Sequence, residues 1–252
     1  MTSDADFRLP RLLFVHIPKT AGTSMTEALA GLYGALTFPA MTTLDYAAYD
    51  DARLLQYRLF KGHAYRRDYK RLPPDTRRLT VLRDPVERAI SFWRYYRSLT
   101  LDGVDDPYVA EAIRLAQSRS PLELIYSESP FVLEHLRLGQ VRQFLPGPTL
   151  HAIGHRQFVT GEMKRQALAD FIAEIDRFDV VLTCEMLRVS LAPAHAALGL
   201  PPPAAPLPRV NISPGTDAVD RLEVRRAMMD VSDAEFACYE HARRREIALL
   251  GG

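Results

Sequence analysis

Small, hydroxyl-bearing and cationic residues gather near the start of the chain, directly after a short apolar run. The run covers residues 11–17 and ends at Pro18, and the segment that follows reads Lys19, Thr20, Ala21, Gly22, Thr23 and Ser24. A glycine-containing loop between a strand and a helix leaves several backbone N–H groups unpaired and directs them at one point, which suits a phosphate-like anion. Lys19 adds a mobile positive charge. The segment therefore predicts an anion-binding loop, with an ordinary strand-to-helix turn as the alternative.

The order of residues in this loop differs from that of the nucleoside-triphosphate P-loop. That motif places Gly-Lys-Ser/Thr at the start of its helix. In this chain Lys19 precedes Gly22, and Thr23 and Ser24 follow the glycine directly. The loop therefore suits a phosphate-like group without matching the triphosphate motif.

A second candidate anion site combines Arg83, which closes an apolar segment, with Ser91, eight positions later. The turn at Asp84 and Pro85 lets the guanidinium and the hydroxyl approach one group. Arginine offers phosphate a rigid fork of donors, and serine can add another. The alternative is a surface arginine paired with Glu87 and an exposed helical serine.

Two residues at or just after the ends of expected strands are candidate general bases. His63 comes after Gly62, and a histidine titrates near neutral pH. The alternative for His63 is a hydrogen-bonded structural histidine. Glu185 is the second candidate base, unless it caps the next helix or holds another site residue. We expect His16 to be a core or supporting residue.

Histidine and cysteine spacing favours neither a metal site nor a disulfide framework. His151 and His155 are four positions apart, but Gly154 interrupts a helix there and no glutamate follows His151. The two cysteines, Cys184 and Cys238, are too few for a disulfide scaffold.

Four apolar segments that alternate with helical patterns must position these residues. The expected strands cover residues 11–17, 58–63, 78–83 and 179–183, and the expected helices cover residues 24–34, 43–57, 84–99, 107–117, 130–144, 162–178, 186–198, 217–229 and 232–249. Capping boxes are expected at 24–27, 84–87 and 232–235. This alternation predicts an α/β sandwich with a parallel sheet, whose carboxyl edge gathers the loops at 19–24, 62–63, 83–84 and 184–185.

Composition describes a globular protein without extremes. The chain has 252 residues, 47% of them hydrophobic and 25% charged, with a formal net charge of +1. A charge this close to zero favours neither nucleic acid nor a membrane surface as a partner. No apolar run approaches the roughly 20 residues of a membrane span, and the acidic N-terminus is unlike a signal peptide. These features lead us to expect a cytoplasmic protein without stable membrane insertion.

Two segments together resemble the sulfotransferases. Residues 15–24 resemble their 5′-phosphosulfate loop, and residues 80–91 resemble their 3′-phosphate motif. The pattern is most similar to the branch containing heparan sulfate 2-O-sulfotransferase and the chondroitin and dermatan sulfotransferases. Weaker similarities at 60–65, 178–185, 211–213 and 236–242 extend the resemblance over nearly the whole chain.

The resemblance implies a P-loop-like three-layer α/β/α sandwich and 3′-phosphoadenosine 5′-phosphosulfate (PAPS) as the donor, with 3′-phosphoadenosine 5′-phosphate (PAP) as the product. A sulfuryl group would move to a hydroxyl or amine of an acceptor such as a saccharide or glycolipid, and no metal would be required. The implied donor contacts are the backbone of 19–24, the hydroxyls of Thr20, Thr23 and Ser24, the side chains of Arg83 and Ser91, and Ser213 in the closing segment.

The resemblance also implies catalytic roles. Lys19 would neutralise charge on the leaving oxygen, and His63 matches the catalytic histidine of the branch. That branch carries a second histidine two residues earlier, where this chain has Lys61. We expect a single domain over residues 1–252, with a helical insertion around 100–160 on the acceptor side that includes Arg142 and Gln143.

Acceptor recognition leaves alternatives open. A basic group could meet an anionic saccharide or form a solvated face, and it comprises Arg66, Arg67, Lys70, Arg71, Arg77 and Arg78. Among Phe92, Trp93, Tyr95 and Tyr96, most rings should be core, and one could stack on adenine or a sugar.

Two other functions compete with sulfuryl transfer. A P-loop kinase would prefer ATP with magnesium. A noncatalytic nucleotide-binding module would bind the donor without turnover.

Overall fold

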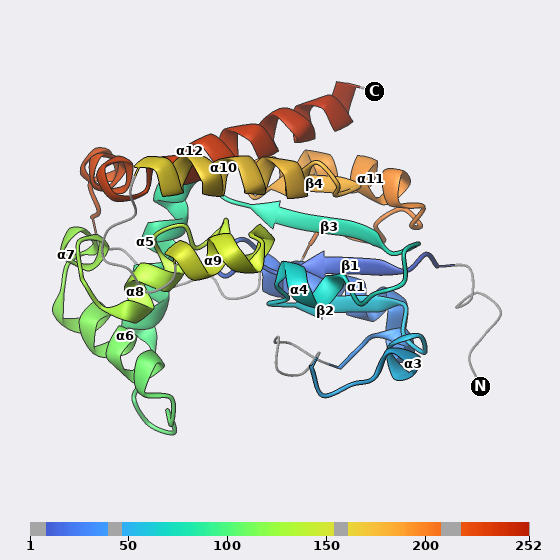
Figure 1. Cartoon of the computed structure of the whole chain (residues 1–252), viewed down its shortest axis with the longest axis horizontal. Coiled ribbons are helices and arrows are strands. Elements are labelled where there is room, and N and C mark those ends of the chain that lie inside the picture. The colour runs from blue at the N-terminus through green and yellow to red at the C-terminus, as the bar shows by residue number, and fades with distance from the viewer. Residues whose placement is uncertain (1–8, 40–46, 154–160, 208–217, 252) are drawn as a thin grey trace.

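A four-stranded parallel sheet forms the centre of the computed structural model, which describes residues 9–39, 47–153, 161–207 and 218–251. The strands are β1 (Leu12–Val15), β2 (Leu59–Gly62), β3 (Arg77–Leu82) and β4 (Val180–Thr183), in the order β2-β1-β3-β4 (Figure 1). All three pairings are parallel. The α/β class with a central parallel sheet is therefore confirmed.

Helices cover both faces of this sheet, because its strands are apolar on both sides. Leu13 and Val15 belong to a core cluster that includes residues of α10 (Gly161–Ile175) and α12 (Arg221–Gly251). Leu12 and Phe14 face the opposite cluster, with residues of α1 (Gly22–Tyr33) and α11 (Leu187–Leu198). Alternate side chains of β1 thus pack against helices on opposite faces, and the sheet lies between two layers of helices.

The strand order creates a crevice at the carboxyl ends of β1 and β3. The chain leaves β1 toward β2 through α1, whereas it leaves β3 toward β4 through α5 (Pro85–Ser98). Connections that diverge in this way leave a gap at the strand ends, where α/β proteins bind ligands. The anion-binding loop and Arg83 both lie at this position.

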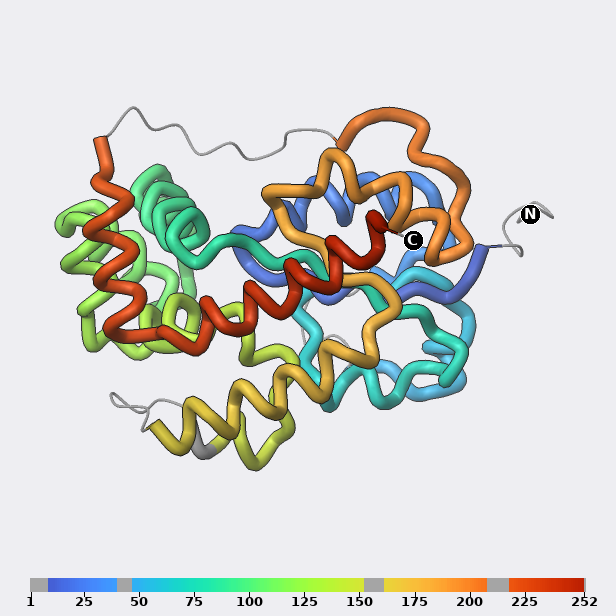
Figure 2. Tube along the Cα trace, turned by 90° about the horizontal axis from the view of Figure 1, so that it is seen from above, coloured from blue at the N-terminus to red at the C-terminus, as the bar shows by residue number. Residues whose placement is uncertain are grey.

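A helical lobe extends beyond the carboxyl edge of the sheet (Figure 1). It contains α5, α6 (Pro107–Ser118), α7 (Pro121–Ile125), α8 (Pro130–His135) and the first part of α12, and it has its own apolar core. Ser232 has non-helical backbone angles and interrupts α12. Beyond this kink, α12 continues over the sheet, so one helix joins the lobe to the sheet (Figure 2).

Two expected helices differ from the structure. Of the helix expected over 43–57, residues 43–46 lie outside the described residues. Ala47 is helical, but the helix is interrupted at residues 48–50 before α3 (Asp51–Leu54). The helix expected over 130–144 is divided into α8 and the 3₁₀ helix η3 (Arg142–Phe144). The chain turns between them at Leu138, which has a φ of 57°. The remaining short helices are η2 (Gly34–Leu36), α4 (Arg66–Tyr69) and α9 (Gly147–Ile153).

The expected capping boxes are wrong, although one of the caps is present. Helix α1 begins at Gly22, so Ser24 lies inside its first turn. Asp84 caps α5 by accepting hydrogen bonds from the N–H groups of Val86 and Glu87. The carboxylate of Glu87 instead pairs with Arg221 at 2.6 Å.

The third box fails for a similar reason. Glu235 is fully buried and pairs with Arg88 at 3.1 Å, so its carboxylate is not available to cap the second half of α12.

Candidate active site

The loop after β1 turns sharply into α1. Lys19 and Ala21 have left-handed backbone angles, with φ values of 69° and 60°. The buried Thr20 hydroxyl donates a hydrogen bond of 2.9 Å to the carbonyl of Ile17. Thr20 does not line the cavity, so this internal bond replaces the ligand contact expected from its hydroxyl. The N-cap residue of α1, Ala21, makes no side-chain hydrogen bond to the helix start, and the N-terminus of a helix favours an anion.

Gly22 packs directly against the imidazole of His16. A Cβ atom at Gly22 would lie 1.7 Å from Cδ2 of His16, which is far closer than two non-bonded carbon atoms can approach. The glycine is therefore required for close approach of the loop to the end of β1. Thr23 and Ser24 follow in the first turn of α1 and line the same cavity.

Arg83, at the start of the second candidate anion site, contacts the loop at residues 19–24. Its Nη1 donates a hydrogen bond of 3.3 Å to the backbone carbonyl of Lys19. Ser91, two turns into α5, lines the same cavity. The carboxylate of Glu87 lies 4.0 Å from Nη2 of Arg83, at the limit of an ion pair. The guanidinium therefore remains beside the anion-binding loop.

Lys19 lies over an aromatic ring in this cavity. Its Nζ is 3.6 Å from the centre of the Tyr95 ring, a cation–π contact that orients the ammonium. Burial, and then the positive charge of Arg83, lower the pKa of Lys19 to about 8. An additional anion between the two cations would raise it again.

The hydrogen bonds of His63 determine which nitrogen can act as a base. Nδ1 lies 2.7 Å from the carbonyl oxygen of His16, so it must carry the proton. This leaves Nε2 unprotonated, and burial lowers the pKa of His63 below the usual 6.5. His63 is thus a neutral imidazole with a free acceptor nitrogen in the tautomer that a general base needs.

His16 packs against His63 and holds its Nδ1 through the backbone carbonyl. It follows β1 directly instead of lying within the strand, and its ring centre is 4.5 Å from that of His63. Burial and the nearby positive charges lower the pKa of His16 to about 3, so the ring stays neutral. The Nε2 amide nitrogen of Gln143 donates to the His16 carbonyl at 3.1 Å, which gives Gln143 a structural contact at the site.

The cavity has a volume of about 1210 Å³ and extends from the loop to the helical lobe. Residues of the lobe side include Tyr108, Phe131, Glu134, His135 and Arg142. Arg142 is paired with Glu134 at 2.7 Å. The sequence interpretation missed His135, whose Nδ1 lies 3.0 Å from the Phe131 carbonyl and whose pKa is lowered by burial. No local pattern distinguishes this histidine.

The remaining aromatic and acidic candidates divide between core and cavity. Phe92 and Trp93 are buried in the lobe, whereas Tyr95 and Tyr96 line the cavity. Glu185 is exposed and does not line the cavity. Its carboxylate accepts hydrogen bonds from the Asp84 amide at 3.1 Å and the Tyr239 hydroxyl at 3.0 Å. Glu185 therefore holds the turn after Arg83.

The basic group around β2 and β3 lies apart from the cavity lining. Most of its members form ion pairs, namely Arg66 and Arg78 with Glu174, Arg71 with Asp51, and Arg77 with Asp179. These residues therefore form ion pairs within the protein, and Arg66 and Arg78 are not part of a fully solvated face. Ser213 lies outside the described residues.

Within the described ranges, no group of three or more histidine, cysteine or acidic side chains is placed to hold a metal ion. His155 lies outside those ranges, and His151 is exposed. None of the described helices is both long and apolar enough to span a membrane.

Comparison with known proteins agrees with this geometry. No curated protein matches the chain significantly. Residues 8–121 match the model of a sulfotransferase family, and this range contains the loop, His63, Arg83 and Ser91. The match covers both anion-binding motifs and three of the four strands. It supports the assignment of this part of the chain to a sulfotransferase family.

Proposed function

We propose that the protein transfers a sulfuryl group from PAPS to a hydroxyl or amine of an acceptor. The observation that carries the proposal is the contact between Arg83 and the Lys19 carbonyl. It joins a loop suited to a 5′-phosphosulfate with an arginine suited to a 3′-phosphate at the crevice between β1 and β3.

The residues present fit such a donor. The N-terminus of α1, with Thr23 and Ser24, would hold the 5′-phosphate. Arg83 and Ser91 would hold the 3′-phosphate, the group that distinguishes PAPS from ATP. Ser213 remains a further proposed contact.

When bound, PAPS supplies a sulfuryl group on a phosphate leaving group. Below its pKa of about 8, Lys19 is protonated and would neutralise the charge that develops on the leaving oxygen. Nε2 of His63 would take the proton from the attacking hydroxyl or amine. No protein metal ligand has a role in this scheme.

The acceptor would occupy the part of the cavity next to the helical lobe. Tyr108 and Phe131 offer aromatic faces there, and Glu134 and His135 offer polar groups. Aromatic faces with adjacent hydrogen-bonding groups suit a saccharide or glycolipid. The resemblance to the heparan sulfate 2-O-sulfotransferase branch supports His63 as the base, with Lys61 replacing the second histidine of that branch.

Calorimetric titration with PAP, ADP and ATP, with and without magnesium, tests the donor. We expect PAP to bind without magnesium and at least about tenfold more tightly than ADP, because Arg83 and Ser91 add charge-assisted hydrogen bonds to the 3′-phosphate. Preference for ATP with magnesium would instead indicate a kinase. Binding of PAP without turnover of PAPS by any acceptor would favour a binding module.

The variant Arg83→Ala tests the 3′-phosphate contact. We expect it to weaken PAP binding by about 10- to 100-fold and AMP binding by less than about threefold, since AMP lacks that phosphate. Arg77→Ala is a matched control, because Arg77 begins the same strand and pairs with Asp179 away from the cavity. Equal weakening of PAP and AMP by Arg83→Ala would refute the assignment.

A further inference from the structure

Arg83 is held by a buried side chain that lies outside the recognisable motifs. We propose that Gln140 is the positioning residue for Arg83 and thereby sets the preference for a 3′-phosphate. This inference rests on the proposed function, because it concerns the arginine assigned to that phosphate.

Gln140 continues the hydrogen-bond pattern of the sheet past the end of β3. The backbone N–H of Arg83 donates to Oε1 of Gln140 at 2.8 Å, and Nε2 of Gln140 donates to the Arg83 carbonyl at 2.9 Å. A neighbouring strand would satisfy the same two backbone groups. The side chain is 1% exposed, so water does not compete for these bonds.

The opposite edge of this segment is also held. The Cys184 amide donates to the Leu82 carbonyl at 2.9 Å, and Glu185 accepts from the Asp84 amide. Arg83 therefore leaves β3 between two sets of hydrogen bonds. The hydrogen bonds to the Arg83 backbone itself come from Gln140.

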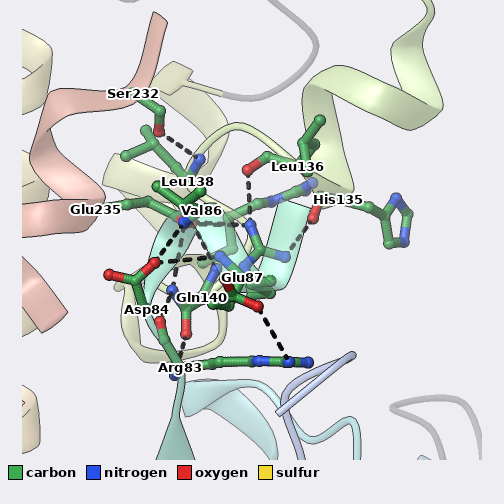
Figure 3. A network of polar contacts seen from close by, with 12 residues as sticks. Arg83, Asp84, Val86, Glu87, His135, Leu136, Leu138, Gln140, Ser232 and Glu235 are labelled. Atoms are coloured by element: carbon green, nitrogen blue, oxygen red, sulfur yellow. Dashed lines mark hydrogen bonds and ion pairs between the residues drawn. The ribbon is translucent and has the colours of Figure 1, made fainter. Parts of the chain in front are cut away.

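Glu235 determines the orientation of the Gln140 amide. One carboxylate oxygen accepts from the Gln140 backbone N–H at 2.8 Å, and the other lies 3.4 Å from Nε2. A carboxylate can only accept, so the NH₂ group must face Glu235 and Oε1 must face the Arg83 amide. Figure 3 shows Gln140 between Arg83 and Glu235.

The same carboxylate is held by a buried arginine. Nη2 of Arg88 lies 3.1 Å from Glu235, and the guanidinium also donates to the carbonyls of His135 and Leu136. Gly139 permits this approach, because a Cβ there would lie 2.1 Å from the His135 carbonyl oxygen. Two walls of the cavity, at Arg83 and at His135, are thus built on one buried network.

Recognition of phosphate by arginine depends on geometry, because the planar guanidinium donates in fixed directions. The Lys19 carbonyl accepts a hydrogen bond from the guanidinium of Arg83, and Gln140 fixes the Arg83 backbone from which the side chain extends. Loss of the Gln140 bonds would free the backbone and misplace the donors. The 5′-phosphate loop would keep its own contacts.

The test compares the affinities of Gln140→Met for PAP and AMP, which differ by the 3′-phosphate. Methionine preserves the length and approximate volume of glutamine and removes both hydrogen bonds. We expect PAP binding to weaken by about tenfold, with AMP affinity changed by less than about twofold. Gln117→Met is the control, because Gln117 donates to a single backbone carbonyl, that of Leu99, outside the cavity.

The outcomes separate this inference from the proposed function. If wild-type protein does not prefer PAP to AMP, both are overturned. If wild-type protein prefers PAP and Gln140→Met keeps the same preference, the inference alone fails. A general loss of structure would lower both affinities together, and equal lowering in a protein that still melts cooperatively would also refute positioning of Arg83.

A second variant keeps the test decisive if Gln140→Met does not fold. Glu235→Gln preserves shape but removes the charge that orients Gln140, and we expect the PAP-to-AMP preference to fall about threefold. Glu246→Gln is its control, since Glu246 is a buried carboxylate on the same helix that bonds Thr183 at the end of β4. An unchanged preference in Glu235→Gln would refute the inference.

Discussion

At the scale of single residues, the site depends on protonation states that the surrounding groups impose. The His16 carbonyl selects the tautomer of His63, and burial keeps both imidazoles neutral. Lys19 is less basic than usual because it is partly buried beside Arg83. The geometry therefore combines a neutral base with a cation whose charge is lost only in alkaline solution.

Replacement of His63 tests its role as base. We expect His63→Ala to lower kcat by about 10²- to 10⁴-fold, the usual contribution of a positioned base. PAP affinity should change by less than about twofold, because the donor contacts remain. His195→Ala is a matched control, since its Nδ1 also lies against a backbone carbonyl but away from the cavity. Unchanged turnover in His63→Ala would place the base elsewhere.

The pH profile of kcat/KM for the donor should reflect the ionisation of His63 and of Lys19. Activity requires neutral His63, so it should fall on acidification only below pH 6.5, because burial lowers the pKa of His63 from that value. It also requires protonated Lys19, so activity should fall above about pH 8. Lys19→Arg should remove the alkaline limb, because arginine stays charged, while reducing the rate through altered geometry. An alkaline limb that persists in Lys19→Arg would belong to another group.

At the scale of elements, the start of α1 is positioned by what it packs against. The first residue of the helix, Gly22, must lack a side chain because the His16 ring lies where a Cβ atom would be. This contact couples the anion-binding loop to His63, whose ring also packs against His16. A displaced His16 would therefore disturb both donor and acceptor chemistry.

Two glycines of α1 provide a test of this coupling. Gly22→Ala forces the His16 ring to move and should reduce the free energy of unfolding by about 1–3 kcal/mol. It should also weaken PAP binding. Gly31→Ala, in the same helix, meets no atom within 4 Å. It should raise stability by about 0.5–1 kcal/mol through helix propensity. Denaturant unfolding measures both, and similar effects of the two substitutions would contradict the close packing at Gly22.

At the scale of the whole molecule, one buried ion pair joins the helical lobe to the final helix. Arg88 in α5 and Glu235 just after the kink of α12 are both fully buried. Their hydrogen bonds extend to Arg83 through Gln140 and to the carbonyl of His135. The two sides of the cavity therefore share a single structural support.

Breaking this pair should be costly. Arg88→Met leaves a buried carboxylate without its cation and should lower the free energy of unfolding by about 3–5 kcal/mol. Arg77→Met removes an exposed pair with Asp179 and should cost less than about 1 kcal/mol. The double variant Arg88→Met/Glu235→Met should recover part of the loss, because neither charge is then buried alone. Equal costs for the two single variants in denaturant unfolding would contradict a supporting role.

The sequence by itself determined the features that depend on neighbouring residues. The strand-and-helix order, the anion-binding loop, the Asp84 cap and the meeting of loops at the carboxyl edge all follow from local pattern and parallel pairing. The tertiary structure alone decided which polar groups pair across long stretches of the chain. Glu235 matches a capping pattern but pairs with Arg88, 147 positions away, and Gln140 holds Arg83 across 57 positions. Local sequence carries no information about such distant partners, because burial and approach in space select them.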